Sequence, residues 1–458
     1  MTEPINEIIN KLILDDRVRI ISDALTIDQD LCLVGGTVRD LFLQRENTDL
    51  DFATTLLPDQ IKNELEKKHI RVIPTGLKHQ TITAYIESLD CSVEITTFRD
   101  EGMSPEGGVK NSNSVITDLQ FRDFTINSLA INIQNKILID PNMGIKDLQN
   151  KIIKGVGDPA ERFSEDPLRI LRMIRFSETL DFKIDDSTFL AGKNLSQSLK
   201  NISIERIREE FNKILLSNKP SRGLQSLLNL GALDIFLPEI SRFKNFEQNK
   251  FHKADLFDHT IEVVDNVECD LITRLAALFH DVGKPDTLTI DEDTGDRHFY
   301  LHEDVGTDIC QTIMKRMKYS NLLIDAVSKL VKTHMRPLSA GPGGLRRILR
   351  DTDPYYLNWR NLKESDAKAC KIESHLIDEQ LKDFDERMNI IQNQNHTSPF
   401  STLAIKGADL IDYGLKPSPK FGEILRALHE IIIENPELNT KDQILDTLLP
   451  EIIKKLAA

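Results

Sequence analysis

The chemistry-bearing residues nearest the N-terminus form a block of two glycines, an arginine and two aspartates. Gly35 and Gly36 follow an apolar run, Arg39 comes three residues later, and Asp49 and Asp51 stand two residues apart. Paired glycines let backbone N–H groups approach an anion, and the start of a helix adds positive potential. Carboxylates two apart on a strand project to one face, where they repel each other unless a cation lies between them. The block predicts a phosphate cradle beside a Mg²⁺ site, as phosphoryl or nucleotidyl transfer requires.

A second set of charged residues advances by three positions at a time. It consists of Asp166, Arg169, Arg172 and Arg175. Residues at this spacing are neighbours on a helix surface, so a carboxylate and three guanidinium groups would share one stripe. An aspartate beside an arginine can pair with the edge of a base, and further arginines can hold phosphate or RNA. Taken alone, the spacing also fits an exposed face of salt bridges.

Histidine and aspartate recur through the second half of the chain. The candidates are His259, the doublet His280-Asp281, His302, His334 and Asp366. The doublet follows the apolar run 271–279, which places an imidazole and a carboxylate together away from water. Such a pocket favours a divalent or transition metal. The alternative for any single histidine is a hydrogen-bonded core residue.

These residues need elements to position them. Short β-branched runs predict strands at 31–34, 49–53, 81–86, 93–97 and 136–139, and a helix is expected from about residue 37. Apolar residues at helical spacing predict helices through 168–174 and 204–216. The polar stretches 101–114 and 291–297 are expected to be loops. Predicted secondary structure and composition divide the chain into four regions, at residues 1–150, 151–240, 241–380 and 381–458.

Composition limits the classes of protein that the chain can be. Its 458 residues, 40% apolar and 29% charged, suffice for about three globular domains. The net charge of −15 excludes a uniformly basic nucleic-acid coat but allows a local basic track. No run of ~18 uncharged apolar residues occurs, so no membrane span is expected. Five scattered cysteines without metal-type spacing favour reduced thiols in a cytoplasmic protein.

The order of motifs over residues 30–180 resembles one family. Gly-Gly-x-x-Arg-Asp followed by Asp-x-Asp is similar to the class II tRNA nucleotidyltransferases and bacterial poly(A) polymerases, a branch of the polymerase-β-like nucleotidyltransferases. Three further motifs stand in the order of that family, at residues 74–81, 93–99 and 122–127. The stretch from Gly157-Asp158-Pro159 to Arg169 resembles its base-selecting helix.

The resemblance implies a fold class and roles. The fold would be α+β and multidomain, with a nucleotidyltransferase head at 1–150 followed by an all-α neck and RNA-binding region at 151–240. Asp49 and Asp51 would hold Mg²⁺, and Asp166 with Arg169 would read the base edge of CTP or ATP. Gly35, Gly36, Arg39, Arg122, Arg172 and Arg175 would contact ribose or phosphate. Glu94 is a candidate for a third acidic contact.

Two departures from the family pattern bear on the product. Phe121 stands where the family usually has the first arginine of Arg-Arg-Asp, and residues 101–114 lack an Arg-Arg-Pro step. In the family that loop is associated with the change from C to A addition. An enzyme that adds only CC is therefore an alternative.

The histidine and aspartate set resembles the HD phosphohydrolase superfamily. His302 and His334 are similar to the extra ligands of its two-metal members. The resemblance implies an all-α HD domain at 241–380, followed by a helical tail at 381–458. In the tRNA enzymes an attached HD domain is associated with 2′,3′-cyclic phosphodiesterase and phosphatase activity, and the metal could be divalent or transition.

The sequence thus predicts template-independent addition of C and A to tRNA 3′ ends from CTP and ATP. A poly(A) polymerase is one rival, and an HD phosphohydrolase whose head only binds nucleotide is another. An acidic protein must concentrate positive charge to hold tRNA. Candidate tracks are the arginines of the 169–175 stripe, Arg206 with Arg208, and Arg346, Arg347 and Arg350.

Overall fold

A computed structural model describes residues 5–25, 30–45, 50–73, 80–103, 109–249, 254–370, 373–397 and 402–457. The chain forms two compact units. The first comprises residues 1–214 and 225–235, and the second comprises 215–224 and 236–458. The finer division into four regions stays a prediction.

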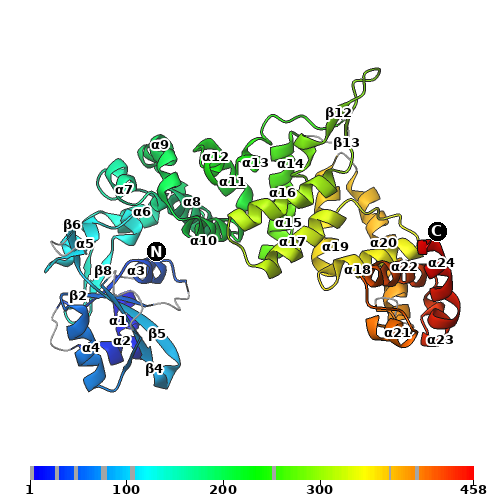
Figure 1. The fold of residues 1–458 in the computed structure, drawn as a ribbon. Coiled ribbons are helices and arrows are strands. Elements are labelled where there is room, and N and C mark those ends of the chain that lie inside the picture. Colours follow the sequence, from blue (N-terminus) through cyan, green and yellow to red (C-terminus); the bar gives the residue numbers. More distant parts are fainter. Residues whose placement is uncertain are drawn as a thin grey trace. The chain divides into compact units, whose positions relative to one another are not determined.

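The first unit is built on a seven-stranded sheet, drawn in blue and cyan in Figure 1. Its strand order is β3-β4-β5-β2-β1-β8-β9, with β2 and β5 parallel and every other pair antiparallel. The strands are β1 (Cys32–Val34), β2 (Asp51–Thr54), β3 (Arg71–Ile73), β4 (Thr81–Ile86), β5 (Cys91–Thr97), β8 (Ala130–Asn132) and β9 (Ile137–Ile139).

Helices cover this sheet and complete its core. They are α1 (Ile5–Ile13), α2 (Asp16–Ala24), α3 (Gly36–Phe42), α4 (Pro58–Lys67), α5 (Val115–Gln120) and α6 (Gly144–Asn150), with 3₁₀ turns at Glu87–Leu89 and Thr125–Asn127. Helix α4 packs against β3, β4 and β5. A buried apolar cluster includes Cys32 of β1, Ala53 of β2, Leu119 of α5 and Phe98, which directly follows β5. This core fixes the strand ends that carry the candidate acids.

The five predicted strands are confirmed to within two residues at each end. The predicted loop at 101–114 is wrong in part, because β6 (Arg99–Met103) pairs antiparallel with β7 (Val109–Asn111). Residues 104–108, including Pro105, lie outside the described residues. The hairpin is anchored at its base, where the Ser112 N–H donates to the Phe98 carbonyl at 2.8 Å. Backbone pairing therefore orders a stretch whose polar side chains gave no strand signal.

The stretch after the sheet is helical, as predicted. It contains α7 (Pro159–Glu165), α8 (Leu168–Leu180), α9 (Asp186–Leu195), α10 (Ile204–Leu215), α11 (Pro220–Asn229), α12 (Leu233–Phe236) and α13 (Pro238–Ser241), a 3₁₀ segment at Ser196–Asn201, and the short parallel pair β10 (Ile152–Ile153) and β11 (Lys183–Ile184). Helix α8 buries Ile170, Leu171 and Ile174 and keeps Arg169 and Arg172 half-buried. Its apolar face thus holds the arginine stripe in place.

The second unit is almost entirely helical. Its elements are α14 (Leu256–Asn266), α15 (Leu271–Phe279), α16 (His302–Arg316), α17 (Asn321–Thr333), α18 (Pro342–Thr352), α19 (Tyr356–Ala369), α20 (Ser374–Thr397), α21 (Gly407–Asp412), α22 (Lys420–Glu434), α23 (Lys441–Gln443) and α24 (Leu449–Ala457), with short turns at Lys284–Asp286, Pro436–Leu438 and Ile444–Leu448. Helices α14, α15, α17 and α19 pack on one another. The predicted loop at 291–297 is the turn of a hairpin between β12 (Leu288–Ile290) and β13 (Arg297–Phe299).

Candidate functional sites

The glycine pair forms a tight turn between β1 and α3. Gly35 has φ +66° and ψ −129°, a conformation that side-chain-bearing residues avoid. A Cβ atom at Gly35 would lie 3.4 Å from Nη1 of Arg122. Thr37, in the first turn of α3, accepts a hydrogen bond from the Asp51 N–H at 2.9 Å. The turn therefore sets the start of α3 directly against the strand that carries the acid.

Asp51 and Glu94 are partners in the parallel register of β2 and β5. Side chains of directly paired residues project to the same face of a sheet. Both acids, with Thr81, Thr96, Arg99 and Arg122, line a cavity of about 240 Å³. Asp49, the second predicted acid, lies outside the described residues. The oxygen-rich pair of Asp51 and Glu94 suits a hard cation such as Mg²⁺.

A larger cavity of about 520 Å³ opens beside this pair, and its lining is strongly cationic. Gly35 and Gly36 belong to the lining, together with seven arginines and three aspartates. The arginines are Arg39, Arg99, Arg122, Arg169, Arg172, Arg175 and Arg206, and the aspartates are Asp51, Asp123 and Asp166. The excess of guanidinium groups suits a polyanion such as a triphosphate. All predicted nucleotide-binding residues meet in this cavity.

Asp123 was not predicted as a site residue, yet it organises the cavity wall. Its carboxylate accepts from Arg172 Nε at 2.8 Å, from Asn127 Nδ2 at 2.9 Å and from the Phe124 N–H at 2.8 Å. Burial opposes ionisation of this group, but the Arg172 charge and these hydrogen bonds outweigh it and lower the pKa of Asp123 to about 2. Its place between Arg122 and Asn127 in a recognised motif was the available signal.

Phe176 brings three of the arginines together. The guanidinium carbons of Arg39, Arg172 and Arg175 lie 5.0, 5.3 and 4.1 Å from the centre of its ring. Cation–π attraction of this kind offsets part of the repulsion among like charges. Burial lowers the pKa of Arg175 to about 10, and Glu210 partly opposes that shift through an ion pair of 3.1 Å. The aromatic ring is therefore a support for the cationic surface.

Asp166 and Arg169 stand at the entrance of α8 but are engaged with protein partners. Asp166 precedes the helix in an extended conformation, and its carboxylate accepts from Arg206 Nη2 at 2.8 Å. Arg169 donates to the Glu165 carboxylate at 2.7 Å and to the Phe121 carbonyl at 2.9 Å. The predicted continuous helical stripe is thus wrong at its first member, because Pro167 follows Asp166 and disfavours a helical backbone there.

Arg122 is tied to the base of the β6–β7 hairpin through a buried acid. Arg122 Nη2 donates to one oxygen of Asp118 at 2.7 Å, and the Arg99 N–H donates to the other at 3.0 Å. Burial opposes ionisation of Asp118, but Arg122 and Arg99 hold its pKa below the usual range. The cavity wall and the hairpin are linked by this single carboxylate.

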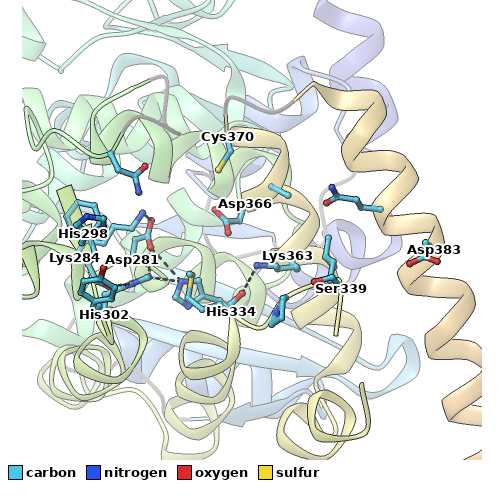
Figure 2. Close-up of a pocket in the computed structure, with 18 of the residues that line it drawn as sticks. Asp281, Lys284, His298, His302, His334, Ser339, Lys363, Asp366, Cys370 and Asp383 are labelled. Carbon is cyan, nitrogen blue, oxygen red and sulfur yellow. Dashed lines mark hydrogen bonds and ion pairs between the residues drawn. The ribbon is translucent and has the colours of Figure 1, made fainter. Parts of the chain in front are cut away.

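The six predicted histidines and aspartates of the second unit meet in one buried cluster. They come from α14 (His259), the end of α15 (His280 and Asp281), the start of α16 (His302), the end of α17 (His334) and α19 (Asp366). His280 Nε2 lies 3.1 Å from Oδ2 of Asp281, and His302 Nε2 lies 3.3 Å from Oδ1. Two groups could hold a metal ion, His259-His280-Asp281 and Asp281-His302-His334, so Asp281 is common to both. Figure 2 shows Asp281, His302 and His334 converging, with Asp366 nearby.

Hydrogen bonds fix the tautomers of three of these rings. Nδ1 of His280, His302 and His334 donates to the carbonyls of Ala277, Phe299 and Val331 at 2.7, 2.8 and 2.7 Å. In the neutral rings each Nε2 then presents a lone pair to the centre of the cluster. His302 Nε2 and His334 Nε2 are only 3.2 Å apart. Lone pairs that face each other and a carboxylate repel unless a proton or a metal ion lies between them, so the residues fit a metal site.

The electrostatic surroundings act differently on the histidines of the cluster. Burial disfavours the charged form of His280, but Asp281 and Asp366 outweigh it and raise the pKa of that ring. Burial lowers the pKa of His334. Burial opposes ionisation of Asp281, but His280 and Lys284 hold its pKa well below the usual range. Lys284, which was not predicted, lies 2.6 Å from Oδ2 of Asp281. The available signal for Lys284 was its place directly after the predicted ligands in the sequence His-Asp-Val-Gly-Lys. Gly283 packs so closely in this segment that a Cβ atom would lie 2.2 Å from the His302 carbonyl oxygen.

The arginine trio that is predicted as an RNA track has partners within the protein. Arg347 and Arg350 form ion pairs with Glu430 of α22 at 2.9 and 2.6 Å, and Arg346 donates to the Ile433 carbonyl at 2.8 Å. These contacts join α18 to α22. Glu430, which pairs with Arg347 and Arg350, lies about 80 positions later in the sequence. RNA binding by the trio stays a prediction.

Among the described residues, no helix is long and apolar enough to cross a membrane.

Comparison with known proteins identifies relatives along most of the chain. Residues 31–154 match the family model "Poly A polymerase head domain", 181–244 match "Probable RNA and SrmB-binding site of polymerase A", and 300–448 match "tRNA nucleotidyltransferase domain 2". The A-adding tRNA nucleotidyltransferase of Deinococcus radiodurans is 33% identical over 68% of this chain and 74% of its own length. The CCA-adding enzyme of Ligilactobacillus salivarius is 30% identical over 92% of both chains. The Bacillus stearothermophilus CCA-adding enzyme in complex with CTP shares the fold, with a TM-score of 0.72 at 22% identity over 97% of this chain and 98% of that one.

Proposed function

The chain belongs to the family of CCA-adding enzymes and related tRNA nucleotidyltransferases, and from that premise we propose that it adds C and A to tRNA 3′ ends from CTP and ATP. The observation that carries the proposal is the arginine-lined cavity beside the register pair of Asp51 and Glu94. The RNA 3′-hydroxyl attacks the α-phosphorus of the nucleotide in line, and pyrophosphate leaves.

Different residues of the cavity bind the nucleotide and the metal ion in this proposal. The backbone at Gly35 and Gly36 and the side chains of Arg39, Arg122, Arg172 and Arg175 bind the triphosphate and ribose. Asp49, Asp51 and Glu94 would hold Mg²⁺. Bound Mg²⁺ supplies neutralisation of phosphate charge and favours the ionised hydroxyl.

Asp166 and Arg169 select the base in this proposal. A carboxylate accepts from, and a guanidinium donates to, the edge of C or A, so protein side chains replace a template strand. Asp166 accepts a hydrogen bond from Arg206, and Arg169 donates one to Glu165. Both hydrogen bonds must break before the two residues can pair with a base.

An Asp51→Asn substitution tests the proposal directly. Loss of one negative charge at the proposed Mg²⁺ site should reduce incorporation of labelled CTP and ATP into tRNA by at least about a hundredfold. Asp59→Asn, at an exposed acid of α4 in the same unit, should leave incorporation unchanged. Full activity of Asp51→Asn would exclude this cavity as the transfer site.

A-only addition is the second candidate. The observation that favours it is the Deinococcus radiodurans relative, which carries the name A-adding tRNA nucleotidyltransferase. An A-only enzyme would extend tRNA ending in CC but not tRNA lacking all three nucleotides.

For the second unit we propose a metal-dependent phosphohydrolase that removes 2′,3′-cyclic or terminal phosphate from RNA 3′ ends. His259, His280, His302, His334, Asp281 and Asp366 would hold the metal. Bound metal supplies an activated water and polarises the phosphoryl group. Asp281 serves both ligand groups, and Lys284 orients its carboxylate.

A His280→Ala substitution tests the hydrolase. The variant should lose bound transition metal, measured by plasma mass spectrometry, and should lose hydrolysis of adenosine 2′,3′-cyclic phosphate. Its incorporation of CTP and ATP should persist, because the proposed transfer site lies wholly in the first unit. His375→Ala, at an exposed histidine of α20, is the matched control. Unchanged metal content in His280→Ala would contradict the proposal.

A further inference from the structure

An aromatic pair stands on the wall of the cavity that contains the histidine cluster. The cavity has a volume of about 630 Å³, and its lining includes His298, Tyr300, Lys284 and Lys363. The rings of His298 and Tyr300 are stacked, with centroids 5.3 Å apart and planes inclined by 12°. The two residues are two positions apart at the end of β13, so they project to the same side of the strand.

The fold does not use the Tyr300 ring for packing. Tyr300 is 69% exposed, whereas Phe299 between the pair is 8% exposed and packs against Phe246 at 6.0 Å. Since His298 covers one face of the Tyr300 ring, the exposed area leaves the opposite face open to a ligand. Nucleobases stack on open aromatic faces of this kind without regard to sequence.

Cationic groups lie on the same cavity wall as the ligands of the cluster. Lys363 donates to the His334 carbonyl at 2.9 Å, which uses one of the three donors of its ammonium group. Figure 2 shows Lys363 with its hydrogen bond to His334, and Lys284 among the labelled residues that line the cavity. A cavity of this volume is large enough for a mononucleotide.

We propose that this cavity recognises a nucleoside phosphate, with its base stacked on Tyr300 and its phosphate directed toward Lys363 and the histidine cluster. The proposal rests on the phosphohydrolase function above and names what its site selects. His298 and Tyr300 would favour phosphates that carry a base over simple phosphate esters. The nucleoside phosphate could be free or could form the 3′ end of an RNA.

Fluorescence quenching of 2-aminopurine tests the stack. The probes are 2-aminopurine riboside 3′-monophosphate and a short single-stranded RNA that ends in the same nucleotide. Both are mixed with the full-length, metal-loaded protein, and the amplitude is read within the first second, before hydrolysis. We expect saturable quenching, with a dissociation constant that rises about fivefold or more in Tyr300→Ala. Tighter binding of the RNA than of the mononucleotide would identify RNA ends as the source.

Matched variants separate stacking from other roles. Tyr300→Trp should retain quenching, because it keeps the aromatic face, and Tyr413→Ala, at another exposed tyrosine of the same unit, should bind as the wild type does. Lys363→Met should weaken binding but keep the quenching amplitude at saturation. Equal quenching and affinity in Tyr300→Ala and wild type would overturn the proposal, as would the absence of saturable quenching in the wild type.

Hydrolysis of adenosine 2′,3′-cyclic phosphate, measured on the same wild-type preparation, distinguishes failure of the base platform from failure of the phosphohydrolase. Hydrolysis without Tyr300-dependent quenching leaves the phosphohydrolase standing and removes the base platform. Quenching that depends on Tyr300 without hydrolysis supports the nucleotide site and contradicts the hydrolase.

Discussion

Asp123 holds the arginine-rich cavity together through one buried carboxylate. It pairs with Arg172 on α8 and fixes Asn127, which in turn accepts from Arg39 Nη1 at 2.7 Å. Removal of one partner of such a pair leaves the other charge partly buried without compensation. The stability of the first unit and the position of two arginines proposed to bind phosphate therefore depend on the same residue.

An Asp123→Asn substitution should lower the free energy of unfolding by about 2–4 kcal/mol at pH 7. The pKa of Asp123 is about 2 in the folded chain, below its ordinary 3.8. The stability due to this shift is therefore complete above about pH 4 and is lost as the pH falls toward 2. Urea unfolding at pH 7, 5, 4 and 3 should show a difference between wild type and variant that narrows below pH 4. A difference that is constant with pH would contradict this role.

Single residues were predictable where their chemistry stood in a compact pattern. The glycine pair, the arginines after residue 166 and all six members of the histidine cluster meet as expected. Phe176 could not be identified, because an aromatic residue on a helical apolar face usually belongs to the core. Only the tertiary fold shows that three guanidinium groups surround it.

At the scale of elements, the turn from β1 into α3 is a constrained connection of the first unit. Gly35 adopts a conformation that costs other residues about 1–3 kcal/mol. Gly36, the next residue, begins the helix, and a Cβ atom there would meet the Arg39 side chain at an ordinary 3.5 Å.

Gly35→Ala should therefore lower the unfolding free energy by about 1–3 kcal/mol, while Gly36→Ala should leave it unchanged or slightly raised. Thermal or urea unfolding of the two variants provides the comparison. Equal effects at the two positions would show that the turn is not strained in the manner described.

Helices and strands were predictable where the apolar periodicity was strong. They were missed where hydrogen bonding between backbone segments, rather than the side-chain pattern, determines the structure. The strands at 81–86 and 91–97 alternate apolar and polar residues and were found. The β6–β7 hairpin carries charged and polar residues, and its anchor on Asp118 is a contact between distant segments. The pairing of α18 with α22 likewise depends on charges far apart in sequence.

At the scale of the whole molecule, the net negative charge of the chain contrasts with the positive charge of one cavity. The chain carries a net charge of −15, yet the cavity of the first unit is lined by seven arginines and three aspartates. A cationic cavity in a chain of net negative charge favours entry of a polyanion at that cavity. Each candidate site is complete within its own unit as far as the described residues go.

The most direct measurement is extension of three tRNA transcripts, ending before CCA, after C and after CC, with Mg²⁺ and CTP, ATP or both. We expect every transcript to be completed to CCA and extension to stop there, with CTP needed for the first two transcripts and ATP needed for all three. Addition of A alone to the CC-ending transcript, a stop after CC, or long tails from ATP alone would contradict CCA addition. Absence of any extension would contradict the transferase itself.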